Sequence, residues 1–223
     1  MSLPSPQRVL FDCLQDGKHD KWGWVIYRCT YDDDEGWNRF KRFIIQQSQA
    51  NIVESDTPEL ADGLEWTFIE DRATLDGASK DQLRSRFKQW ASEALKTEQP
   101  RVEDPLSTAY GNPRYTYFIH VDESALKSMV YGGPQPPKMD GRRGYVNFVD
   151  AEWKPLSEIK SDLGIVDEAE DEVHEPIDGC TEENVGWMRI ALHMVGAEFY
   201  ELMMGNRDVW YTVYKRSPQV SNW

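Results

Sequence analysis

Apolar and polar residues alternate along this chain in two ways, one typical of strands and the other typical of helices. Residues 22–31 are apolar on both of their alternating faces, which predicts a central strand covered on both sides. Trp37, Phe40 and Ile44 then recur at helical spacing, and an aspartate at position 33 or 34 is placed to cap the helix that this spacing predicts. A central strand therefore leads directly into a helix.

The rest of the chain continues this alternation. The clearest helix follows Ser79, because Ser79 and Gln82 form a capping-box pattern and an apolar stripe continues from there to Leu95. A second long stripe predicts a final helix that begins at Thr181 and ends at Gly205. A short helix is predicted over 123–130, and four further strands are predicted over 64–70, 114–121, 144–153 and 208–215.

Alternation of strands and helices indicates helices packed on one sheet. We expect an α+β fold, a single sandwich of helices on a mostly antiparallel, ferredoxin-like five-stranded sheet. A doubly wound parallel sheet is the competing fold, but it would normally carry Gly-rich turns after its strands, and three aspartates follow the first strand instead. We expect one domain over 22–216, a loose polar leader over 1–21 and a C-terminal tail over 217–223.

Composition narrows the classes of function. The 223 residues include nine Trp, ten Tyr and eight Phe, enough aromatic side chains to build a substantial core, and the formal net charge is −14. Such an acidic surface argues against nucleic acid and anionic membranes as partners. Three widely spaced cysteines predict neither a disulfide framework nor a zinc site, and no signal peptide or membrane-spanning run is visible. We expect a soluble cytoplasmic protein without a metal or cofactor.

Arg28 lies in the middle of the first predicted strand, among apolar residues. An arginine in that position needs a partner. One alternative is a carboxylate or phosphate group of a ligand, which a guanidinium binds well. The other is an internal ion pair with Glu70, Asp122 or Asp150, which lie in or at the ends of predicted strands.

His120 and Asp122 are two positions apart in a predicted strand, so their side chains share one face. They could act as a base and its orienting acid, or simply form a hydrogen bond at a strand end. Arg142 and Arg143 end a segment rich in Gly and Pro, 131–143, which is either a mobile lid that meets an anionic ligand or a passive loop. With Arg28, these four residues are the candidate ligand-binding residues.

Four runs of the sequence carry a resemblance to a known group of proteins. They are WGWVIYRCTYDDDEGW, DGASKDQLRSRFKQW, PIDGCTEENVGWMRIA and WYTVYKR, and together they span most of 22–216. In these runs the chain resembles a family of fungal intracellular hypothetical proteins that has no assigned activity. The resemblance implies a fungal source and a stand-alone soluble protein, and it supplies no catalytic residue.

Two functional hypotheses follow. The first is an intracellular binding protein without catalytic activity, whose aromatic-rich sheet holds a small molecule or a protein partner, with a homodimer as an open alternative. The second is a small-molecule enzyme of fungal secondary metabolism, in which Arg28, His120 and Asp122 line a pocket between sheet and helices. The sequence contains no recognisable catalytic motif, which favours the first hypothesis.

Overall fold

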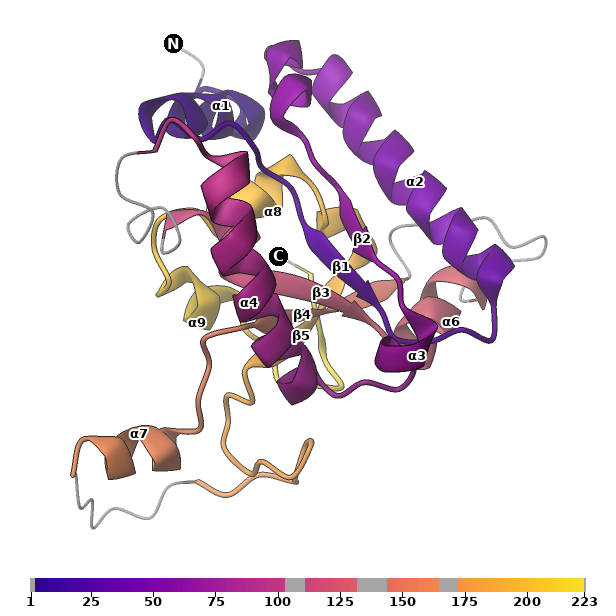
Figure 1. The fold of residues 1–223 in the computed structure, drawn as a ribbon, viewed down its shortest axis with the longest axis vertical. Coiled ribbons are helices and arrows are strands. Elements are labelled where there is room, and N and C mark those ends of the chain that lie inside the picture. Colours follow the sequence, from indigo (N-terminus) through magenta and orange to yellow (C-terminus); the bar gives the residue numbers. More distant parts are fainter. Residues whose placement is uncertain (1–2, 103–110, 132–143, 165–171, 223) are drawn as a thin grey trace.

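The computed structural model describes residues 3–102, 111–131, 144–164 and 172–222 of the chain. They form an α+β fold around a six-stranded mixed sheet in the order β2-β1-β3-β4-β5-β6 (Figure 1). Strand β1 pairs in parallel with both β2 and β3, β3-β4-β5 are antiparallel, and β5 and β6 are again parallel. The strands are β1 (Val25–Arg28), β2 (Thr67–Ile69), β3 (Tyr117–Val121), β4 (Tyr145–Asp150), β5 (Trp187–Ala191) and β6 (Val220–Ser221).

Helices cover both faces of this sheet. Three long or medium helices follow the first strands and connect them, while short helices gather toward the C-terminal end of the chain. Among the described residues, no helix is long and apolar enough to cross a membrane. The helices are α1 (Pro6–Asp16), α2 (Asp34–Val53), α3 (Arg72–Leu75), α4 (Lys80–Glu98), α6 (Glu123–Tyr131), α7 (Leu156–Asp162), α8 (Ala197–Leu202) and α9 (Val209–Val213).

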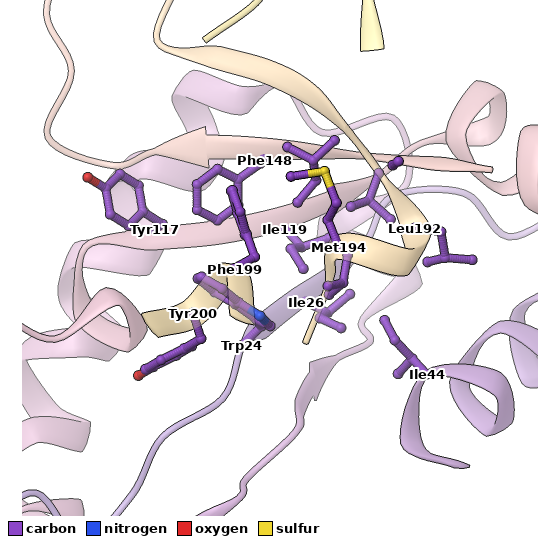
Figure 2. Close-up of a cluster of buried hydrophobic side chains, with 14 of the residues drawn as sticks. Trp24, Ile26, Ile44, Tyr117, Ile119, Phe148, Leu192, Met194, Phe199 and Tyr200 are labelled. Carbon is purple, nitrogen blue, oxygen red and sulfur yellow. The ribbon is translucent and has the colours of Figure 1, made fainter. Parts of the chain in front are cut away.

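The larger core lies on the sheet face that α1, α2, α6, α8 and α9 cover. Alternate strand residues such as Ile26, Ile119 and Phe148 point into it, as period-two alternation requires. In Figure 2 these side chains meet Ile44 of α2 and Phe199 of α8. This face is therefore closed by apolar packing between segments that are far apart in the sequence.

The smaller core lies on the opposite face, beneath α4. Val25, Phe118 and Val149 point to this side, and Leu83 and Phe87 of α4 pack on them. Leu75 of the short helix α3 also joins this core, but helices still cover less of this face than the five helices cover of the other. The chain beyond Asp150, which includes residues 153–157 and 177–187, completes the cover. The first hollow described below lies there, and the second lies between this segment and α9.

A buried arginine connects the end of α4 to the segments that lead into β1 and β2. Arg114 is fully buried and makes two bonds of 2.7 and 2.8 Å to the carboxylate of Glu98. It also donates to the carbonyls of Gly23 and Glu65 and to the hydroxyl of Thr67, at 3.2, 2.9 and 2.8 Å. All of its donor groups are engaged inside the fold, which a buried guanidinium requires. The local sequence gives no sign of this role.

Several predicted elements are confirmed. Asp33 caps α2, and Asp122 accepts a hydrogen bond of 2.8 Å from the backbone of Ala125 in the first turn of α6. The capping box before α4 is present, with both Ser79 and Gln82 making their reciprocal bonds. The α+β class is also confirmed. The mostly antiparallel, ferredoxin-like sheet of five strands is not, because the sheet is mixed and has six strands.

The predicted final helix over 181–205 is wrong. Residues 187–191 form β5 instead, and a turn over 192–194 leads to the short helix α8. The apolar stripe misleads because Met188 and Leu192 fit a helical period, while Met188 and Ile190 fit the alternation of a strand just as well. Pairing with β4 decides in favour of the strand. Gly186, with φ of +72°, also excludes a right-handed helix that runs from Thr181 through this position.

The structure also differs from expectation near both ends. The predicted strand over 208–215 is the helix α9, which buries Trp210 and Val213 three residues apart. The sixth strand comes from the expected tail, 217–223. In the expected leader, Pro6–Asp16 forms α1, capped by Ser5, with Leu10 and Leu14 in the core. Helices α1 and α9 each pack apolar residues at helical spacing on a partner surface that no local pattern shows, and β6 forms by pairing with β5.

Candidate functional site

Arg28 finds its partners inside the protein. Its side chain donates to the carbonyl of Thr30 at 2.8 Å, forms an ion pair with Asp34, and lies 3.5 Å from the carboxylate of Glu70. The guanidinium also lies 4.4 Å from the centre of the Tyr31 ring. Of the two alternatives for Arg28, this geometry is that of an internal ion pair, and it includes Glu70, one of the three predicted acids.

Electrostatics at Glu70 agree with that pairing. Burial alone would raise the pKa of its carboxyl group. The hydrogen bond from Lys41 and the positive charges of Lys41 and Arg28 outweigh burial, so the pKa is lowered from its ordinary value. Glu70 therefore remains a carboxylate at neutral pH and holds the end of β1 to α2.

His120 and Asp122 lie on one strand face, as predicted, but Asn147 of β4 connects them. The Asn147 amide lies 3.2 Å from Nδ1 of His120 and donates to the Asp122 carboxylate at 2.9 Å, whereas His120 and Asp122 are 3.9 Å apart. All three residues lie toward the α4 side, because His120 follows the alternation of Phe118. The only sequence signal for Asn147 is a polar residue within an apolar strand.

His120 is neutral at physiological pH. Its burial, and next the charge of Lys80, lower its pKa from the ordinary value to about 4, against the opposing effect of Asp122. A neutral imidazole can accept a hydrogen bond from Asn147 and donate one to the Ala78 backbone. His120 is therefore part of a satisfied hydrogen-bonded row.

Of the predicted site residues that the structure describes, His120 and Asp122 lie close together, but Arg28 does not join them. Arg28 faces α2, and His120 faces α4 on the other side of the sheet, so the cleft beside His120 is not lined by Arg28 in the part of the chain that the structure describes. Arg142 and Arg143 lie outside the described residues, and their role stays a prediction. In the described part of the chain, His, Cys, Asp and Glu side chains form no group that could hold a metal ion.

A cleft of about 510 Å³ opens beside His120, which we call the His120 cleft. The N-terminus of α4 and residues 177–182 border it. Lys80 lies 3.9 Å from the centre of the Trp187 ring and 3.1 Å from the Asp178 carboxylate, which also accepts a bond of 3.0 Å from the Trp187 indole. The polar groups at this entrance therefore satisfy one another.

A second hollow, of about 660 Å³, lies between α7 and α9, and we call it the α7–α9 groove. Its floor is an ion pair in which Arg207 makes bonds of 2.9 and 2.7 Å to the two carboxylate oxygens of Asp150. Burial raises the pKa of Asp150, although the charge of Arg207 opposes that effect. The apolar side chains of the groove are Trp153, Leu156, Ile159, Trp210, Tyr211 and Tyr214.

Helix α7 is held to the protein by few contacts. The Glu182 carboxylate accepts bonds from the backbone N–H groups of Leu156 and Ser157, at 2.7 and 3.2 Å. None of the seven described residues of α7 is buried. Figure 1 shows α7 set apart from the other helices. The helix is therefore fixed mainly through the carboxylate that caps it.

Apolar side chains are exposed where α7 meets the groove. Leu156, Ile159 and Leu163 are 44%, 39% and 68% exposed, and Tyr211 of α9 is 69% exposed. The three α7-side residues are spaced i, i+3 and i+7, so they lie on one side of the helical turn. That spacing is visible in the sequence, but the many acidic residues over 157–178 favour an irregular connector, and the structure instead forms the short helix α7 over Leu156–Asp162.

Trp153 is the wall between the His120 cleft and the α7–α9 groove, and it lines both. It packs against Gly186, where an added Cβ would lie 2.3 Å from the indole ring and 2.6 Å from the Arg84 guanidinium. The Arg84 guanidinium lies 4.9 Å from the centre of the Trp153 ring and donates to the Gly186 carbonyl at 3.0 Å. The wall is therefore fixed by a close backbone approach.

Comparisons with known proteins leave the site to be interpreted from its geometry. No protein-family model, curated protein or solved structure matches the chain.

Proposed function

We propose that this protein is a protein-binding protein that takes an apolar segment of a partner chain into the α7–α9 groove. The observation that carries the proposal is the gathering of exposed apolar side chains around one hollow. Of the seven large apolar residues that are exposed among the described ones, three line this groove and Leu163 follows directly on α7.

Single exposed apolar residues are ordinary on protein surfaces, whereas a contiguous exposed patch is typical of a binding site. Val53 is also exposed, but it lies at the end of α2 and lines neither the His120 cleft nor the α7–α9 groove. It is therefore a single exposed apolar residue and not part of a patch. Tyr211 and Trp210 add aromatic side chains of the kind that are enriched in interface cores.

The two sides of the groove are held to the protein to different extents, which suits recognition of a segment. Trp210 stacks on Tyr117 of β3, with ring centres 5.8 Å apart and planes 2° apart, so α9 rests on the sheet. Helix α7 on the other rim is fixed mainly by Glu182. A partner side chain would thus meet a fixed aromatic surface on one side and an adaptable aliphatic one on the other.

A display library of random dodecapeptides tests this proposal against the full chain. Enriched peptides should bind with affinities that fall about tenfold in Ile159→Ser and in Tyr211→Ser, as expected for loss of an apolar anchor. Val53→Ser is the matched control, because it makes the same kind of change at an exposed site outside the groove, and it should leave the affinity unchanged.

Both groove substitutions are at exposed positions, so circular dichroism should confirm that each variant folds. A library that yields no enriched peptide would contradict the proposal. So would enriched peptides that bind all three variants as tightly as the unchanged protein.

A further inference from the structure

The charges around the α7–α9 groove indicate what the partner segment carries besides its apolar residues. Five carboxylates and two cationic side chains line the hollow, a formal net charge of −3, and the whole chain has a net charge of −14. Resting on the proposed function, we propose that the groove selects a cationic segment, in which apolar anchors are flanked by lysine or arginine.

The two cationic side chains of the groove are already bound within the protein. Arg207 holds Asp150 through both carboxylate oxygens. Lys154 lies between Glu158 and Asp162 of α7, at 2.8 and 3.2 Å. Neither is therefore placed as a ready counter-charge for an acidic partner.

Three of the five carboxylates are also engaged within the protein: Asp150 by Arg207, Glu152 by Lys88 at 3.2 Å, and Glu182 by the first N–H groups of α7. The other two, Glu183 and Asp208, lie at the rim. Glu183 lies next to Glu182, and its one described ion pair is with His174, at 3.1 Å. Asp208 precedes α9 and makes no side-chain capping bond to that helix. Carboxylates at a rim steer association and select the sign of a partner's charge more than they add to affinity.

A second copy of this chain is disfavoured as the occupant for the same reason. Two copies that met through this groove would bring two acidic rims together, on chains that each carry a net charge of −14. Like charges that face each other across an interface oppose binding. The cationic segment therefore belongs to another protein.

The composition of peptides from the same library tests the inference. Enriched sequences should combine leucine, isoleucine or aromatic residues with an excess of lysine and arginine. Their affinity should fall when the sodium chloride concentration rises from 50 to 300 mM, since salt screens exposed charges. The rim variant Glu183→Gln/Asp208→Asn should weaken binding about fivefold, mainly by slowing association.

A matched control separates a local effect from a change in overall charge. Glu35→Gln/Asp76→Asn also removes two exposed carboxylates, which lie at α2 and after α3 and do not line the groove. It should leave the affinity almost unchanged. If it weakens binding as much as the rim variant, the selection comes from net charge and the inference is overturned.

The outcomes also separate the two proposals. Peptides that require Ile159 and Tyr211 but carry no excess positive charge, and bind equally at both salt concentrations, would overturn this inference and leave the proposed function standing. Sedimentation of the full chain at twice its monomer mass, reversed by Ile159→Ser, would replace the cationic partner with a second copy. Peptides indifferent to Ile159→Ser would contradict the proposed function itself.

Discussion

Arg114 and Arg207 each hold a carboxylate through two hydrogen bonds, yet one pair is sealed in the interior and the other lies on the floor of the α7–α9 groove. Arg114 is fully buried, and its remaining N–H groups donate to two backbone carbonyls and a hydroxyl. The Arg207 side chain is 37% exposed and holds both carboxylate oxygens of Asp150. The same kind of ion pair can therefore stabilise the interior in one region and form part of a surface hollow in another. The exposed fraction of the arginine side chain distinguishes the two.

The largest expected effect tests that distinction directly. Arg114→Met leaves the Glu98 carboxylate and two carbonyls without their partner in the interior, and should lower the free energy of unfolding by about 3–5 kcal/mol. Arg207→Met should lower it less, by about 2 kcal/mol, because Arg207 is itself 37% exposed, although the change leaves the buried Asp150 carboxylate without its cationic partner. Urea unfolding monitored by tryptophan fluorescence measures both, and equal losses would erase the contrast.

Arg28 lies between these two extremes. Its own side chain is buried, but its partner Asp34 is largely exposed and Glu70 is half-buried. Arg28→Met should therefore cost about 2–3 kcal/mol in urea unfolding, less than the change at Arg114. A loss near zero would mean that the internal ion pair contributes nothing to stability and would revive the ligand-binding alternative for this residue.

The burial of His120 should make the free energy of unfolding depend on pH. The pKa of this side chain is about 4 in the folded protein against an ordinary value of 6.5, so only the unfolded chain gains a proton between these values. The free energy of unfolding should therefore fall as the pH drops from 6.5 to 4, by about 2–3 kcal/mol from this group. His120→Gln should flatten that part of the pH profile, and an unchanged profile would show that His120 does not cause it.

The smallest effect belongs to the rim of the groove. Glu182→Ala removes the acceptor for the first N–H groups of α7 and should cost about 1 kcal/mol, confined to that helix. Hydrogen exchange should show faster exchange in 156–162 and an unchanged sheet. Glu182→Gln keeps an acceptor and is the matched control. If exchange rises across β4 and β5 as well, α7 is part of the cooperative core rather than a separate rim.

Much of the fold could be predicted because local signals and tertiary structure agree there. The capping box at Ser79, the cap at Asp33 and the apolar positions of β1 each mark an element that the structure contains. Agreement failed at 187–191, where one set of apolar residues fits a helix and a strand alike, and only pairing with β4 decides.

The candidate site was harder to predict, for a different reason. Arg114, Asn147 and the Asp150–Arg207 pair depend on contacts between residues 16 to 91 positions apart in the sequence, which no local pattern encodes. Leu156 and Ile159 do have helical spacing, but their stretch is short and surrounded by acidic residues. The predicted arginine and histidine were individually buried as a site would require, yet the sheet separates them onto opposite faces.

The close contact between Gly186 and Trp153 determines what a single mutation at position 186 would do. Any codon change that gives residue 186 a side chain puts a Cβ within 2.3 Å of the wall shared by both hollows, in a backbone conformation that other residues rarely adopt. Such an allele would retain the chemical groups of the cleft and of the groove and would still displace the surface between them. One nucleotide at this position could thus alter two hollows at once, whereas most single changes around them would alter only one.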